Sequence, residues 1–241
     1  MEDRTKLFDG YLSNHYEHVR GKGHLRHRKM NYLRANYERF LPPNRQARIL
    51  DIGPGYGEFL EMLHKGYGFI NAHGIDLSRE VVDYCNTITP NSCTHVGDST
   101  EYLKQHVGEF DCIFMMHILE HIPKSEIIAF LTAVYQALTP DGYLVIEVPN
   151  MANPITGLNI RYADFTHEVG FTELSLGYVL KSVGFSVVTT FGSKLPFDSY
   201  FRIPQYIVQE MAGLVISLLY RGYASKRPHV ITPNLCAIAR K

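Results

Sequence analysis

From residue 47 onward, short apolar runs alternate with stretches whose apolar residues recur every three or four positions. Short apolar runs bounded by turn residues are typical of buried strands, and the longer periodic stretches are typical of amphipathic helices. Strands are predicted over residues 47–52, 69–75, 92–96, 110–116, 143–148, 185–191 and 230–239, and helices over 58–64, 79–87, 100–106, 124–138 and 172–183. Strands that alternate with helices indicate an α/β fold built on a mostly parallel sheet.

An N-terminal extension, residues 1–46, precedes this alternation and is predicted to be helical. Residues 1–50 hold eleven Lys or Arg and five Asp or Glu, a balance of +6 in a chain of zero net charge. Such a charge run is either a solvated helical face or a cationic lid beside a site that receives an anionic ligand. Both interpretations stay open at this point.

A second addition, residues 194–229, lies between the last two predicted strands. Within it, residues 203–220 form an amphipathic helix whose stripe comprises Ile207, Met211, Leu214, Val215 and Leu218. The stripe predicts core packing or a homodimer contact. It could also cover an acceptor site or rest on a membrane surface, since Arg221, Lys226 and Arg227 follow it.

Composition excludes several classes of protein. The chain has 241 residues, of which 45% are hydrophobic and 20% charged, so it suits one domain over residues 47–241 with its extension. Zero net charge argues against nucleic-acid binding. Four scattered cysteines without a C-x-x-C pair indicate a reducing compartment. We therefore expect a cytoplasmic protein, with peripheral contact at the inner membrane as a variant of that expectation.

The strongest chemical signal is the turn after the first strand. Asp51 precedes three closely spaced glycines, and a helix follows. Asp76 ends the second strand nineteen residues after Gly57. An acidic residue in that position meets ribose hydroxyls in nucleotide-binding α/β folds. The carboxylate of Asp51 would repel a pyrophosphate, but it suits a cationic ligand.

This D-x-G-x-G-x-G turn resembles motif I of the class I S-adenosylmethionine-dependent methyltransferases. The I-D-L-S segment at residues 75–78 resembles the family's ribose loop, and V-G-D-S at residues 96–99 resembles its adenine loop. The resemblance implies a Rossmann-like, seven-stranded sheet with an antiparallel last strand. It also implies S-adenosylmethionine as cofactor and S-adenosylhomocysteine as product. The cofactor-binding residues it implies are Asp51, Gly53, Pro54, Gly55, Gly57, Asp76, Leu77, Asp98, Ser99 and His117.

The sequence His117-Ile-Leu-Glu120-His121 also fits the H-x-x-E-H zinc motif. That motif needs a helix, whereas this segment follows a predicted strand, so a zinc protease is not expected. Some quinone-pathway O-methyltransferases resemble the segment and hold a divalent cation with a Glu-His pair. We expect no metal here, and Glu120 with His121 would be its ligands if one bound.

Residues 150–170 are polar, show no clear helical period and leave the cofactor edge of the sheet. Long ordered loops are usually functional, so this segment is the predicted acceptor loop. His167 is the first candidate for a general base and His121 the second, because histidine titrates near neutral pH. The candidate acceptor-binding residues are Arg161, Tyr162, Asp164 and Glu168.

The D-F-T-H-E string at residues 164–168 and its continuation resemble a subset of methyltransferases associated with surface-polysaccharide and other glycan pathways. The resemblance implies methyl transfer to a hydroxyl or phosphoryl oxygen of a sugar or glycan precursor, such as in capsule synthesis. Two alternatives stay open: an O-methyltransferase of a small aromatic or quinone-type metabolite, and a cofactor-binding protein without catalysis. No nucleic-acid partner is expected, because the N-P-P-Y signature is absent after the fourth strand.

Overall fold

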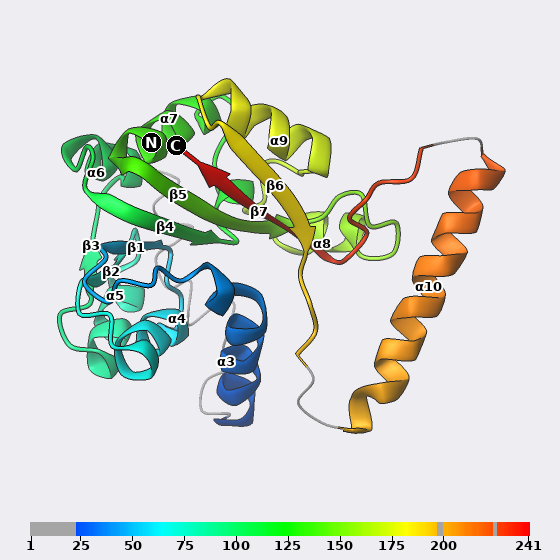
Figure 1. Cartoon of the computed structure of the whole chain (residues 1–241), viewed down its shortest axis with the longest axis horizontal. Helices are drawn as coiled ribbons and strands as arrows, with labels where there is room; N and C mark the ends of the chain where they lie inside the picture. The colour runs from blue at the N-terminus through cyan, green and yellow to red at the C-terminus, as the bar shows by residue number, and fades with distance from the viewer. Residues whose placement is uncertain (1–22, 197–199, 224–225) are drawn as a thin grey trace.

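A computed structural model describes residues 23–196, 200–223 and 226–241, and it has a seven-stranded sheet in the order β3-β2-β1-β4-β5-β7-β6 (Figure 1). The strands are β1 (Ile49–Ile52), β2 (Ala72–Asp76), β3 (Cys93–His95), β4 (Phe110–Met116), β5 (Leu138–Pro149), β6 (Val187–Gly192) and β7 (Asn234–Arg240). Along this order, the strands from β3 through β2, β1 and β4 to β5 all pair in parallel. β7 runs antiparallel to both β5 and β6. The predicted fold class is confirmed.

Helices cover both faces of the sheet. They are α3 (Gly23–Tyr37), α4 (Glu58–Glu61), α5 (Arg79–Ile88), α6 (Ser99–Gln105), α7 (Ile127–Ala137), α8 (Gly157–Ala163), α9 (Glu173–Ser182) and α10 (Ile203–Gly222). Short 3-10 turns are η1 (Glu38–Phe40), η3 (Leu119–His121) and η4 (Tyr200–Arg202), and a π-helical turn η2 (Met62–Gly66) extends α4. The part of the predicted helical extension before residue 23 lies outside the described residues.

Alternation along β4 divides the core into two layers. Ile113 and Met115 pack in the larger cluster, with α7 and α9, whereas Cys112 and Phe114 pack in a second cluster with α3 and α4. Successive side chains of a strand point to opposite faces, so one buried strand supplies both layers. The near-continuous apolar run at β4 follows from this burial on both sides.

The carboxyl ends of the parallel strands meet at one edge of the sheet. β1 lies between β2 and β4: the chain first moves outward from β1 through β2 to β3, and the crossover from β3 to β4 then passes to the other side of β1. In open α/β sheets, ligands bind beyond the carboxyl ends of the strands at such a switch point. The segments after β1, β2, β4 and β5 therefore converge there, and these segments carry the candidate residues.

Two local features differ from the sequence predictions. The predicted acceptor loop, residues 150–170, contains the helix α8, whose seven residues are too few to show a periodic signal. β5 begins at Leu138, before the strand predicted over residues 143–148, and in this added part Asp141 has a φ of 64° and the register with β4 shifts. Four residues of β5 and one of β4 lie between the pairs Phe110–Leu138 and Cys112–Tyr143, so β5 turns locally before the ladder resumes. The predicted boundaries of lid, acceptor loop and insertion stay predictions.

The helix α10 stands away from the sheet, joined to it by two connecting segments (Figure 1). The five stripe residues predicted at 207–218 are between 54% and 63% exposed. Core packing is therefore the wrong interpretation of that stripe, because within α10 the buried residue is Ile216. In the described parts of the chain, no helix combines the length and apolarity needed to cross a bilayer. The cytoplasmic location stays a prediction.

Candidate functional site

The glycine-rich turn joins β1 to α4 through three residues with positive φ. Gly53, Gly55 and Gly57 have φ values of 73°, 55° and 68°, a region that L side chains rarely adopt. A Cβ at Gly53 would lie 2.1 Å from Cδ1 of Ile118, so a side chain there would also clash. No such contact arises at Gly55 within 4 Å, which leaves its backbone open on that side. The turn thus presents bare backbone at the switch point.

Asp51 is buried at the end of β1, beside this turn. It is 1% exposed, and neither carboxyl oxygen has a hydrogen-bond partner among the described residues. Burial, and then the charge of Asp76, raise the pKa of Asp51 to about 8. A buried carboxyl group without a partner is costly, and a cationic or hydrogen-bond-donating ligand would remove that cost. The geometry therefore fits the cationic ligand that the sequence indicates.

Of the two further acidic residues, Asp76 ends β2 and Asp98 follows β3. Asp76 accepts a hydrogen bond from the Ser78 backbone N–H at 2.8 Å, and burial raises its pKa to about 6. Asp98 caps α6, since it accepts from the backbone N–H groups of Thr100 and Glu101 at 2.7 and 3.2 Å. Capping is a sufficient structural reason for Asp98. Of the other predicted cofactor residues, Pro54 is buried, and Leu77 and Ser99 are half-buried.

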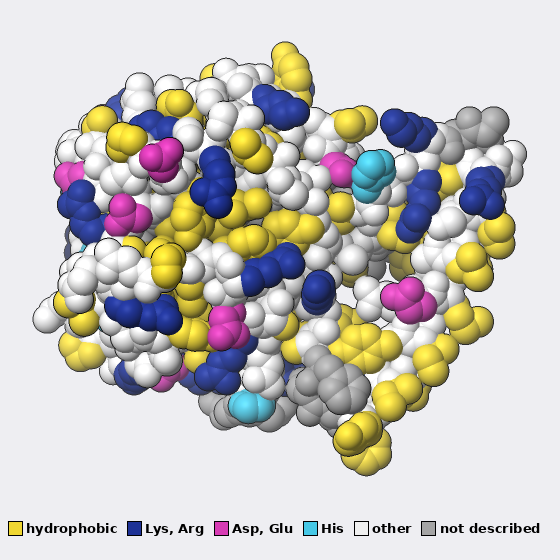
Figure 2. Space-filling model, in the orientation of Figure 1, with side chains coloured by type: hydrophobic (Ala, Val, Ile, Leu, Met, Phe, Trp, Pro, Cys, Tyr) yellow, Lys and Arg dark blue, Asp and Glu magenta, His cyan; other side chains and the backbone are white. Residues whose placement is uncertain are grey.

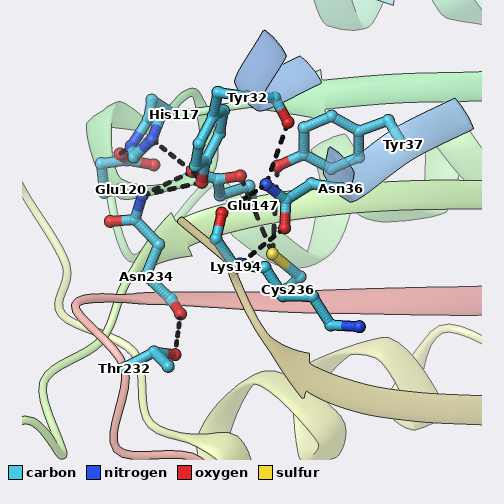
Figure 3. Close-up of polar contacts among 10 residues, drawn as sticks. All are labelled: Tyr32, Asn36, Tyr37, His117, Glu120, Glu147, Lys194, Thr232, Asn234 and Cys236. Carbon is cyan, nitrogen blue, oxygen red and sulfur yellow. Dashed lines mark hydrogen bonds and ion pairs between the residues drawn. The ribbon is translucent and has the colours of Figure 1, made fainter. Parts of the chain in front are cut away.

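His117 lies between two buried carboxyl groups directly after β4 (Figure 3). Its Nδ1 is 3.1 Å from Oε1 of Glu120, and its Nε2 is 2.9 Å from Oε1 of Glu147. The φ of 58° at His117 turns the chain into this position. The predicted cofactor residue is thus the centre of a polar network, and its side chain remains 37% exposed at the site.

Glu147 connects this network to α3 and β7. Its Oε1 accepts hydrogen bonds from the Tyr32 hydroxyl at 2.7 Å and from Nδ2 of Asn234 at 2.6 Å (Figure 3). Burial raises the pKa of Glu147 above its ordinary value. Sequence reasoning assigned no role to Glu147. A lone acidic residue within an apolar strand was the available signal, because buried charges are rare unless they are paired.

His121 and His167 come together although 46 positions separate them in the sequence. Their ring centroids are 4.7 Å apart. Nδ1 of His167 lies 2.9 Å from the Ile160 carbonyl oxygen, which can only accept a hydrogen bond. Nδ1 of His167 therefore carries the hydrogen, and in the neutral ring Nε2 carries the lone pair.

The same reasoning assigns the tautomer of His121. The Thr166 hydroxyl donates to Oδ1 of Asp164 at 2.6 Å, so it accepts from Nδ1 of His121 at 2.8 Å. The neutral His121 ring then also has its lone pair on Nε2. Burial lowers the pKa of His121, which favours this neutral form. Burial tends to raise the pKa of Asp164, but hydrogen bonds from Thr166 hold it below its usual range.

Glu120 joins the two histidines in a group that could hold a metal ion. Glu120, His121 and His167 each offer one ligand atom, and these atoms lie within 4.8 Å of one another. Oε2 of Glu120 is buried and has no hydrogen-bond partner among the described residues. Two imidazoles and a carboxylate suit a divalent transition metal. The sequence named two of these ligands, and the structure adds His167. His117 is not part of this group.

The remaining predicted acceptor residues are less closely gathered. The Arg161 guanidinium donates to the backbone oxygens of His167 and Glu168, so it supports the segment that carries His167. Tyr162 is 77% exposed, and the Arg161 guanidinium lies 5.4 Å from the centre of its ring. Glu168 is exposed, and its backbone N–H donates to the Glu120 carbonyl at 2.7 Å. The structure therefore brings Asp164 to the histidines and gives Arg161 a supporting position.

The strand order, the glycine turn and the acidic residues at the ends of β1 and β2 together define a class I S-adenosylmethionine-dependent methyltransferase. Residues 24–190 match the family described as "Methyltransferase domain", and the chain belongs to that family. The orphaned Asp51 carboxyl and the open turn fit S-adenosylmethionine, whose amino and sulfonium groups are cationic. The chain is thus an enzyme of methyl transfer.

Known proteins similar to this chain act on different acceptors. The chain is 26% identical to the ubiquinone biosynthesis O-methyltransferase of Hydrogenovibrio crunogenus, over 81% of this chain and 76% of that protein. It is 27% identical to the dTDP-3-amino-3,6-dideoxy-alpha-D-glucopyranose N,N-dimethyltransferase of Streptomyces fradiae, over 58% of this chain and 54% of that protein. A solved S-adenosylmethionine-dependent methyltransferase from Archaeoglobus fulgidus superimposes with a TM-score of 0.68 at 27% identity, covering 96% of this chain and 100% of that one.

Proposed function

We propose that this enzyme methylates a hydroxyl oxygen of a small-molecule acceptor and that His167 is the general base. The observation that carries the proposal is the orientation of His167, whose Nδ1–H donates to the Ile160 carbonyl and leaves a lone pair on Nε2. His121, 4.7 Å away between ring centroids, is held in the matching tautomer by Thr166. A lone pair fixed in this way is suited to accept the proton of an acceptor hydroxyl.

Asp51, Asp76 and the glycine turn would hold S-adenosylmethionine, which would supply a methyl group on a positively charged sulfur and, after its transfer, remain as S-adenosylhomocysteine. The acceptor oxygen forms the new bond to the methyl carbon, and its proton passes to Nε2 of His167. The Ile160 carbonyl keeps the His167 ring in the accepting orientation throughout. Asp164 and Thr166 do the same for His121, the second candidate base. Much of the rate enhancement would come from alignment of the two reactants.

A phenolic hydroxyl is the acceptor that we favour. The acceptor segment exposes apolar and aromatic side chains: Ile155, Leu158, Tyr162 and Phe165 are between 65% and 93% exposed. A phenol has a pKa of about 10, closer to that of histidine than an aliphatic hydroxyl, so a histidine base suits it. The similarity to a ubiquinone biosynthesis O-methyltransferase supports the same class.

A sugar hydroxyl or another oxygen of a glycan precursor is the second candidate acceptor. The D-F-T-H-E segment favours it, and one relative is named for a nucleotide-linked sugar. A sugar presents many hydroxyl groups and little apolar surface, so it would use the exposed apolar residues of the segment poorly. The two candidates differ enough in chemistry to be separated by one acceptor panel.

The test is release of S-adenosylhomocysteine with panels of phenols, catechols and nucleotide-linked sugars. We expect turnover of a phenolic acceptor, and a loss of about 100-fold in kcat for His167→Gln, because general-base catalysis contributes at least that much. Cofactor affinity, measured by titration calorimetry, should stay unchanged in the variant. His229→Gln, a change at a side chain that is 79% exposed, is the matched control and should keep full activity.

Chelation separates a base from a metal ligand. If His167 is a base, activity survives dialysis against a chelator. Loss of activity after chelation, restored by a divalent cation, would mean that Glu120, His121 and His167 bind that cation, and the general-base role would be wrong. Cofactor binding without turnover of either panel would support the alternative of a non-catalytic cofactor-binding protein.

Asp51 should couple cofactor binding to proton release. Its pKa of about 8 means that the carboxyl group is largely protonated at pH 7, whereas a bound cation favours the ionised form. Cofactor affinity should therefore rise between about pH 6 and pH 8, with protons released to the buffer. Calorimetry in buffers of different ionisation enthalpy measures that release, and Asp51→Asn should abolish it. A pH-independent affinity in the wild type would contradict the role of Asp51.

A further inference from the structure

The outer face of α10 is an apolar surface that the body of the molecule leaves uncovered. Its members are Ile207, Val208, Met211, Leu214, Val215, Leu218 and Leu219, each between 54% and 64% exposed. Figure 2 shows hydrophobic side chains along the outer edge of this helix. Apolar patches of this extent on a protein surface usually mark an interaction site.

The opposite side of α10 already has its contact with the protein. Ile216 is 7% exposed, and a Cβ at Gly213 would lie 3.5 Å from Cδ1 of Ile231. Residues 213 and 216 lie on one side of a helix with 3.6 residues per turn, and residues 207, 211, 214 and 218 lie on the other. The exposed residues therefore face away from the part of the protein that Ile216 contacts.

The spacing along the outer face matches that of paired helices. Ile207, Met211, Leu214 and Leu218 follow one another at intervals of four, three and four residues. Such spacing forms a continuous seam when two helices pack side by side.

Charge along the helix favours a protein partner over a lipid surface. Between residues 203 and 220, Glu210 is the sole charged residue, and the basic residues lie at the ends: Arg202 precedes the helix, Arg221 is in its last turn, and Lys226 and Arg227 follow it. Helices that bind at a bilayer surface usually carry Lys and Arg along their polar face to attract anionic lipids. A polar face almost without charge suits contact with protein instead.

We propose that α10 pairs with α10 of a second copy of this chain. The seven exposed side chains offer on the order of 700 Å² per copy, close to the roughly 800 Å² that each partner buries in a standard interface. A two-fold dimer uses the same face of both copies, so an apolar seam on one copy meets an apolar seam of equal length on the other. The site around His121 and His167 lies on other elements, so the dimer does not depend on the proposed acceptor.

The test is the molar mass of the full chain in solution, measured by sedimentation and light scattering over a range of micromolar concentrations. We expect a mass of two chains for the wild type. The double variant Leu214→Glu/Leu218→Glu should have the mass of one chain, because it places two carboxylates in the seam. Ile70→Glu/Leu174→Glu, at positions 65% and 86% exposed outside α10, is the matched control and should stay dimeric.

A cross-linking experiment covers the case in which the charged variant folds poorly. The four native cysteines are buried, so Leu214→Cys adds one accessible thiol. A short bifunctional maleimide should link two copies of Leu214→Cys but not two copies of Leu174→Cys. Three results would overturn the proposal: a monomeric wild type, a dimer that survives the double substitution, or a monomer that binds anionic phospholipid vesicles through α10.

Discussion

The helices α3 and α10 are both additions to the same sheet, and their burial is the reverse of their composition. α3 is rich in basic and polar residues, yet Leu33, Asn36 and Tyr37 are each at most 1% exposed. α10 is apolar along most of its length, yet its buried residue is Ile216. Whether a helix packs against the sheet therefore depends on whether a few of its residues meet a complementary surface. It does not depend on how many apolar residues the helix contains.

α3 packs on a surface that is complementary to it in both shape and polarity. The Tyr37 ring meets those of Phe59 and Phe114 edge-on, with centroids 6.4 Å away in each case. Asn36 exchanges two hydrogen bonds with the Lys194 backbone, at 2.7 and 2.9 Å. These bonds join α3 to the start of the segment that leads to α10. α3 thus anchors the start of the segment that connects β6 to α10.

The largest expected difference between the two helices comes from truncating an aromatic anchor on α3. Tyr37→Ala should reduce the free energy of unfolding by about 3–4 kcal/mol, since it removes a large, fully buried ring. Leu214→Ala on α10 should change that free energy by less than about 0.5 kcal/mol under conditions in which the chain is monomeric. Urea unfolding followed by circular dichroism measures both values.

Equal losses for the two variants would contradict the comparison. A large loss for Leu214→Ala at high protein concentration, and a small loss at low concentration, would instead agree with the dimer proposed above, because association stabilises the folded state by mass action. The concentration dependence therefore separates packing within one chain from packing between two.

A smaller effect is expected where α3 meets the functional site. Tyr32→Phe removes the hydroxyl that donates to buried Glu147 and accepts from Nδ2 of Asn234 at 3.3 Å, but Asn234 keeps its bond to Glu147 and Glu147 keeps its contact with His117. The free energy of unfolding should fall by about 1 kcal/mol, the net value of one such hydrogen bond. Tyr178→Phe, at a ring that is 74% exposed, is the control and should have no measurable effect. No loss for Tyr32→Phe would mean that the network does not hold α3 in place.

Much of the fold could be predicted from periodicity, because most strands are buried within the sheet and most helices bury one face against it. The prediction at residues 110–116 matches β4 to the residue, since this strand is buried on both faces and its apolar run is continuous. The helix α8 could not be predicted in this way, because two turns leave no measurable period. Much of the cofactor turn was also predictable, because its glycines are needed by local backbone geometry.

The candidate chemistry depended on contacts between distant segments. Asp51 and its glycines lie within a few residues of each other, so the sequence alone determined that a nucleotide-type cofactor turn exists. The meeting of His121 with His167, and of Glu147 with Tyr32, was decided by the sheet order and the docking of α3, which bring residues 46 and 115 positions apart into contact. Local patterns record what each segment requires of its own backbone, whereas partners across the chain are chosen by the packing of all segments together.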